Sequence, residues 1–154
     1  MPDSSNRTPF LIFYEKSNLT LANKMLDMGA NICQMDDTGL FALKYALIRR
    51  HNEEVTRLIE RGAKINQLDH KNRNLLHHAV NMSSATADAT FETEQLLIDH
   101  GVNINQVDDR GRVPLHYAFV KIDNWNGQDQ IDPIETVSSL CGQPGLQIEV
   151  ADKW

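Results

Sequence analysis

Apolar residues recur along this chain at fixed distances from a repeated aspartate. Asp3, Asp36 and Asp69 stand 33 residues apart, and Asp108 follows after a further 39. The residue seven positions after each of these aspartates is large and apolar: Phe10, Leu43, Leu76 and Leu115. A pattern that returns at one period indicates a single structural unit built several times.

Within one period the pattern predicts two short helices and a turn. Residues 40–48 have apolar side chains at helical spacing, and 53–61 follow with acids in the first turn, an arginine in the last and Gly62 just beyond. These are helix start and stop signals, and Asn52 is the expected N-cap of the second helix. The chain from Ala63 onward is rich in Asn and Asp, so we expect an extended turn that projects from the helix pair.

Further positions in each period are predicted to form the core. The aspartates that close the four periods are Asp36, Asp69, Asp108 and Asp152. Four residues before each of them is an isoleucine: Ile32, Ile65, Ile104 and Ile148. Eleven residues before it is another apolar residue: Met25, Leu58, Leu97 and Cys141. Ala46, Ala79 and Ala118 share a position where a small side chain lets helices approach closely, and Phe13 departs from that rule. One helix pair cannot bury both of its apolar faces, so neighbouring pairs must stack.

The last two periods are longer than 33 residues because each contains an insertion. The first, 81–90, is small and polar, and Asp88 or Thr90 at its end is the expected cap of a helix over 91–100. The second, 121–131, ends at Asp132-Pro133-Ile134-Glu135, a helix start with a cap, a proline and a reciprocal glutamate. Trp125, in its middle, either folds back onto the helices or is an exposed aromatic anchor.

These residues resemble the ankyrin repeat family. The period matches, and Thr8-Pro9-Phe10-Leu11 and Val113-Pro114-Leu115-His116 are similar to the family's Thr-Pro-Leu-His motif, as are residues 74–79, whereas Lys44 departs from it. The resemblance implies an all-α ankyrin-repeat solenoid of about four helix-turn-helix units with projecting β-turn or hairpin loops. The expected domain is a single array over 1–154, with repeats at about 3–35, 36–68, 69–107 and 108–151. Residues 152–154 would then begin a truncated fifth repeat.

The six histidines do not form a predicted metal site. His77 and His116 occupy one position in adjacent units, about 10 Å apart, which is too far for two ligands of one zinc ion. The resemblance implies that the motif histidine hydrogen-bonds backbone at the repeat junction. The second insertion lacks the acidic residues of a calcium loop, and no nucleophile–base pair, glycine-rich phosphate loop or Cys-x-x-Cys occurs. We therefore expect no catalytic residue, cofactor or metal.

Composition narrows the range of expected cellular locations. The 154 residues carry a net charge of −6 and are 41% hydrophobic, and no apolar run approaches the ~20 residues that span a bilayer. No signal-peptide pattern is present, and the two cysteines, Cys33 and Cys141, lie too far apart along the array to form a disulfide. These features predict a cytoplasmic or nuclear monomer with no membrane partner.

The resemblance implies binding of a protein along the face made by the turn tips and first helices. Mapped by position, that face carries eight basic and three acidic residues, a net charge of +5. Arg7, Arg73 and Arg112 share a position where arginine is common in the family that the chain resembles, and without them the net charge is +2. The balance favours an acidic or phosphorylated protein or peptide, and the acidic chain disfavours nucleic acid. The predicted partner-binding residues are Arg49, His70, Lys71, Asn81, Arg110, Arg112, Lys121 and Trp125. The alternative is a targeting region of a larger enzyme, such as a tankyrase-like ADP-ribosyltransferase, a kinase or a ubiquitin ligase.

Overall fold

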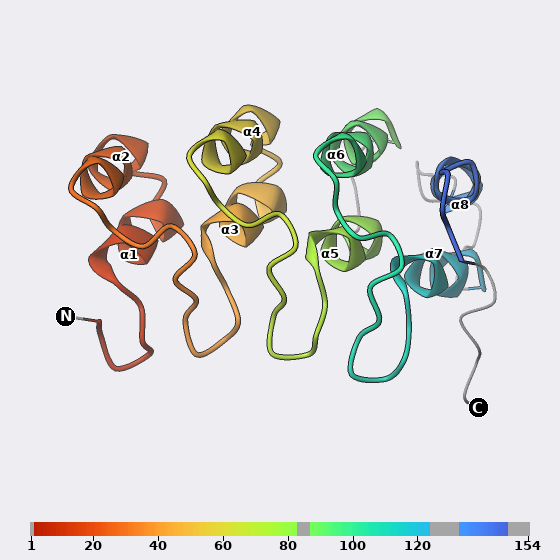
Figure 1. Ribbon diagram of the computed structural model, residues 1–154, viewed down its shortest axis with the longest axis horizontal. Coiled ribbons are helices and arrows are strands. Elements are labelled where there is room, and N and C mark those ends of the chain that lie inside the picture. The colour runs from red at the N-terminus through yellow and green to blue at the C-terminus, as the bar shows by residue number, and fades with distance from the viewer. Residues whose placement is uncertain (1, 83–86, 124–132, 148–154) are drawn as a thin grey trace. The chain divides into compact units, whose positions relative to one another are not determined.

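The computed structural model describes residues 2–82, 87–123 and 133–147. Over these residues the protein is all-α, with eight helices and no strand (Figure 1). The chain divides into two compact units, Met1–His70 and Lys71–Trp154. Each unit is built from helix pairs joined by long loops.

The first unit contains α1 (Pro9–Glu15), α2 (Leu19–Asp27), α3 (Ala42–Ile48) and α4 (Asn52–Glu60). α1 packs against α2 and α3, and α3 packs against α4. Caps set the helix starts: the Thr8 side chain accepts the N–H of Leu11, and that of Asn18 accepts the N–H of Leu21. The loop between α2 and α3 projects beyond the first helices, on the side away from α2 and α4 (Figure 1).

The second unit contains α5 (Leu75–Asn81), α6 (Ala87–Asp99), α7 (Pro114–Asp123) and α8 (Pro133–Cys141). α5 packs against α6 and α7, and α7 packs against α8. Asn74 begins α5 with a capping box: its side chain accepts the N–H of His77, and the His77 imidazole accepts the N–H of Asn74. We call α1, α3, α5 and α7 the first helices, and α2, α4, α6 and α8 the second helices.

The predicted core positions of the first helices are confirmed. Phe10, Leu43, Leu76 and Leu115 are at most 6% exposed. Ala46, Ala79 and Ala118 are also buried, whereas Phe13 at the same position is half-buried. Leu58 and Leu97 are buried in α4 and α6. The first helices therefore carry most of the contacts that hold each unit together.

The predicted burial of the isoleucines is wrong. Ile32, Ile65 and Ile104 are only half-buried, because they lie in the turns that follow the second helices, where packing covers one side of a residue. Ile148 lies outside the described residues. Cys141 is exposed because it is the last residue of α8, where the chain turns at Gly142, and Met25 is half-buried.

Two predicted helix caps are also wrong. Asn52 is the first residue of α4, and its N-cap is His51, which makes no side-chain capping hydrogen bond. The chain enters α4 through Arg50, whose φ of 57° turns it one residue earlier than the capping signal indicated. α6 begins at Ala87, so Asp88 and Thr90 lie inside the helix. The alanines there favour helix, and the insertion lengthens α6.

Candidate functional site

The repeated aspartate builds a rigid tip on each projecting loop. We call residues 3–7, 36–40, 69–73 and 108–112 the loop tips. In three of them the aspartate Oδ1 accepts two backbone N–H groups, those of the residues two and four positions later, at 2.9–3.0 Å: Ser5 and Arg7 on Asp3, Thr38 and Leu40 on Asp36, Arg110 and Arg112 on Asp108. An anionic acceptor that satisfies two donors explains why aspartate recurs at this position.

The tips are also joined to one another by backbone hydrogen bonds within each unit. In the first unit the N–H of Asp37 donates to the carbonyl of Ser5 at 3.1 Å, and in the second the N–H of Asp109 donates to the carbonyl of Lys71 at 2.9 Å. The third residue after each aspartate has a positive φ, which is 57° at Asn6 and 75° at Gly111. Asn6 therefore serves backbone geometry, as expected from its position.

The residue two positions after the aspartate differs between the units. In the first unit it carries a hydroxyl, Ser5 or Thr38, and in the second it is a cation, Lys71 or Arg110. Thr38, Lys71 and Arg110 are exposed, and Ser5 is half-buried. Summing charge over the whole predicted face hides this difference. The difference between the units is visible in the sequence when this single position is compared between them.

Arg112 belongs to a cluster at the base of its tip. Its guanidinium donates to Asp108 Oδ2 at 2.8 Å and to the Tyr117 hydroxyl at 2.7 Å, and it also lies 4.5 Å above the Tyr117 ring. Desolvation acts to raise the pKa of Asp108, but the hydrogen bonds from Arg112, Tyr117 and the Arg110 backbone outweigh it and lower the pKa to about 2. Desolvation, together with the neighbouring carboxylate, raises the pKa of Tyr117.

Arg49 is likewise engaged inside its unit. Its guanidinium donates to the carbonyl of Tyr14 at 2.6 Å and to that of Glu15. These carbonyls lie at the C-terminal end of α1, where the helix dipole favours a cation. Arg49 and Arg112 thus have structural roles that charge and position alone did not indicate.

The other predicted binding residues are spread over both units. In the first, His70 is exposed at its loop tip, with Nε2 3.3 Å from the carbonyl oxygen of Asp36. In the second, Asn81 is exposed at the end of α5. Trp125 lies outside the described residues, and so does the side chain of Lys121.

The junction between a first helix and the following tip also differs between the units. In the second unit His77, on α5, has Nε2 3.1 Å from the carbonyl of Arg112; because a carbonyl oxygen can only accept, Nε2 is the donor. The backbone hydrogen bond expected of this histidine is therefore present. In the first unit Lys44, on α3, donates to the Gly39 carbonyl and to Asp69 Oδ2, both at 3.2 Å. Both side chains of this ion pair are buried.

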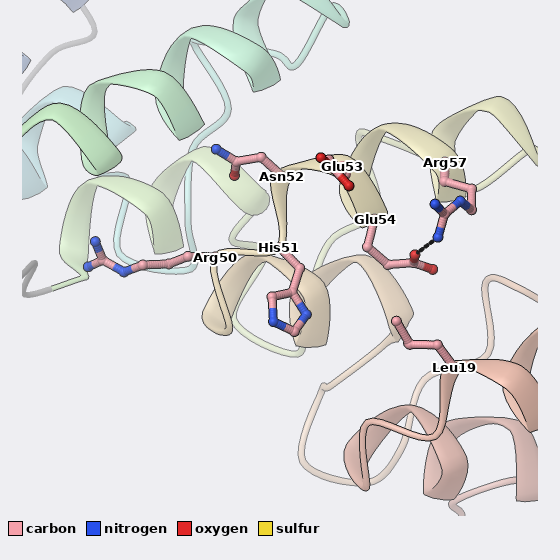
Figure 2. Close-up of a pocket in the computed structure, with 7 residues that line it drawn as sticks. All are labelled: Leu19, Arg50, His51, Asn52, Glu53, Glu54 and Arg57. Carbon is pink, nitrogen blue, oxygen red and sulfur yellow. Dashed lines mark hydrogen bonds and ion pairs between the residues drawn. The ribbon is translucent and has the colours of Figure 1, made fainter.

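A hollow of about 510 Å³, which sequence reasoning did not anticipate, lies in the first unit where the turn before α4 faces the start of α2. It is lined by Leu19, Arg50, His51, Asn52, Glu53, Glu54 and Arg57 (Figure 2). Glu54 is buried, and it accepts hydrogen bonds from Tyr14 and Arg57. Arg50 extends away from the other labelled side chains, whereas Arg57 bends toward Glu54 (Figure 2). The lining thus mixes both signs of charge and gathers neither around one point.

The residues that the structure describes contain neither a metal site nor a membrane-spanning helix. No group of three or more His, Cys, Asp or Glu side chains is placed to hold a metal ion there. No helix in the same part of the chain is long and apolar enough to cross a membrane. Comparison of the chain with models of known protein families and with curated proteins gives no match.

Proposed function

We propose that this chain is a non-catalytic, ankyrin-type repeat array that binds a partner protein through its loop tips and first helices. One observation carries the proposal: the first helices begin at Pro9, Ala42, Leu75 and Pro114, which repeats the 33-, 33- and 39-residue spacing of the aspartates. Helix pairs that recur with a sequence period are typical of repeat proteins. Repeat proteins characteristically bind partners over an extended surface.

The loop tips are suited to recognition because they are ordered before binding. The aspartates of the loop tips accept hydrogen bonds from the backbone of their own tip, as Asp36 and Asp108 do. The backbone hydrogen bonds donated by Asp37 and Asp109 join neighbouring tips within each unit. A surface that is already ordered loses little conformational entropy when a partner docks. The hydroxyl and cationic side chains that it carries supply hydrogen-bond donors for that partner.

Site-specific photo-crosslinking tests this proposal in cell extract with the full chain. A photoreactive amino acid replaces Asp37 or Asp109, both exposed at loop tips, and in control variants it replaces Lys24 or Glu60, both exposed on second helices. We expect the two tip positions to capture the same partner segment reproducibly, and the helix positions to capture it at least tenfold less. Equal capture at tip and helix positions would reject the tips as the binding surface.

A further inference from the structure

The charges of the second unit are distributed very unevenly. Residues 1–70 contain nine basic and nine acidic side chains, whereas residues 71–154 contain six basic and twelve acidic ones. Four of those six cations stand at the loop tips, in residues 71–73 and 108–112, which we call the basic tips: Lys71, Arg73, Arg110 and Arg112. The more acidic unit therefore has most of its cations in its loop tips.

The acids within the basic tips offset this charge only in part. The Asp108 side chain is fully buried and its oxygens accept hydrogen bonds from Arg112, Tyr117 and the loop backbone. Asp109 is the one exposed acid there, against two exposed cations, Lys71 and Arg110. The corresponding positions of the first unit hold Ser5 and Thr38, so no equivalent cationic pair exists in its tips.

The backbone holds the two exposed cations in a defined arrangement. The Lys71 carbonyl accepts the N–H of Asp109, the residue next to Arg110. Lys71 and Arg110 therefore project from neighbouring tips whose main chains are joined, one cation on each tip. An extended chain that crosses both tips would meet one positive charge at each.

We infer that the basic tips bind an acidic linear segment of a partner protein, whose carboxylates meet Lys71 and Arg110. This rests on the proposed function and names the partner's chemistry. Carboxylates suit the site better than phosphates because the exposed Asp109, next to Arg110 and bonded to the Lys71 carbonyl, repels a dianion more strongly than a single negative charge. The exposed cations Lys71 and Arg110 also attract such a segment electrostatically as it approaches.

The test measures binding of fluorescein-labelled peptides to the full chain by fluorescence polarisation. The probes are a repeating Asp-Gly-Ser peptide, its Lys-Gly-Ser counterpart and a phosphoserine version with no aspartate. We expect the Asp peptide to bind, the Lys peptide not to bind, and the affinity for the Asp peptide to fall as salt rises. Tighter binding of the phosphoserine peptide by tenfold or more would overturn the assignment to carboxylates.

Two double variants locate the binding surface. Lys71→Ser with Arg110→Thr gives the second unit the residue types of the first, and we expect about a tenfold loss of affinity, since exposed ion pairs contribute modestly each. Lys24→Ser with Lys64→Thr removes the same charge from exposed sites elsewhere and should change affinity less than twofold. Equal losses in both variants would mean that only net charge matters, and would overturn the inference.

The reverse pair of substitutions tests whether the two cations are sufficient for binding. Ser5→Lys with Thr38→Arg places the cationic pair on the tips of the first unit, and affinity for the Asp peptide should rise about threefold. If the Asp peptide does not bind the wild-type chain while the tip crosslinks still capture a partner, the inference fails and the proposed function stands. If neither occurs, both fail.

Discussion

The two units of this protein attach a first helix to the following loop tip through different side-chain interactions. In the second, a histidine on α5 hydrogen-bonds the backbone of the following loop tip. In the first, Lys44 occupies the same position on α3 and forms a buried ion pair with Asp69, the first residue of the next tip. The attachment of a first helix to the next tip is thus a structural requirement that a hydrogen bond to the backbone or a salt bridge can satisfy.

The consequence of the difference lies in how each junction fails. A buried ion pair contributes little net stability compared with an apolar pair, but removing one partner leaves a buried charge. Loss of a hydrogen bond to the backbone leaves only an uncompensated carbonyl group. We therefore expect the first unit to be more sensitive than the second to a single substitution at this position.

The largest expected effect is at Lys44. Lys44→Met leaves Asp69 buried without its lysine and should lower the free energy of unfolding by about 3 kcal/mol. Urea denaturation followed by circular dichroism measures this change, with the exposed Lys64→Met as a control that should stay within about 0.5 kcal/mol. Adding Asp69→Asn to Lys44→Met should recover part of the loss. A loss below about 1 kcal/mol for Lys44→Met would contradict the role given to the ion pair.

The corresponding change in the second unit should cost less. His77→Leu removes the hydrogen bonds to the Asn74 N–H and the Arg112 carbonyl, and should lower the free energy of unfolding by about 2 kcal/mol. The same urea titration measures it, and the exposed His100→Leu serves as the matched control. If His77→Leu proves more damaging than Lys44→Met, the contrast between the junctions is wrong.

The smallest expected effect concerns Asp108 and pH. Its pKa in the folded protein is about 2, below the ordinary 3.8, so its contribution is complete above about pH 4 and is lost as pH falls toward 2. Asp108→Asn cannot titrate, so wild-type stability should decline about 1.5 kcal/mol more than that of the variant between pH 5 and pH 2, after allowance for screening. Urea midpoints at steps of pH measure the difference. Parallel pH profiles would show that Asp108 is not stabilised as described.

Much of the local structure followed from short-range signals. α8 begins at Pro133, as the proline indicated, α3 lies within the predicted run 40–48, and α4 is displaced by one residue from the predicted 53–61. These signals work because capping, proline placement and helical spacing act within one or two turns of chain. The errors at Asn52 and at the start of α6 are shifts of helix boundaries, where such signals are weakest.

The candidate surface was less predictable. Exposure of Lys71 and Arg110 agrees with their place in the loop tips, but charge and position alone did not distinguish them from Arg49 and Arg112. The latter two are held by the Tyr14 and Glu15 carbonyls and by Asp108. Arg49 reaches groups more than 30 residues away in the chain, which no local pattern reports.

The sequence by itself determined where the helices and tips lie, because its period, caps and turn residues act locally and repeat. The tertiary structure decided which members of that repeated pattern are buried or engaged. It left Ile32, Ile65 and Ile104 half-exposed in turns, and it paired Lys44 with Asp69 across 25 residues. Burial and ion pairing depend on which segments fold against each other, and identical positions in successive units do not have identical neighbours.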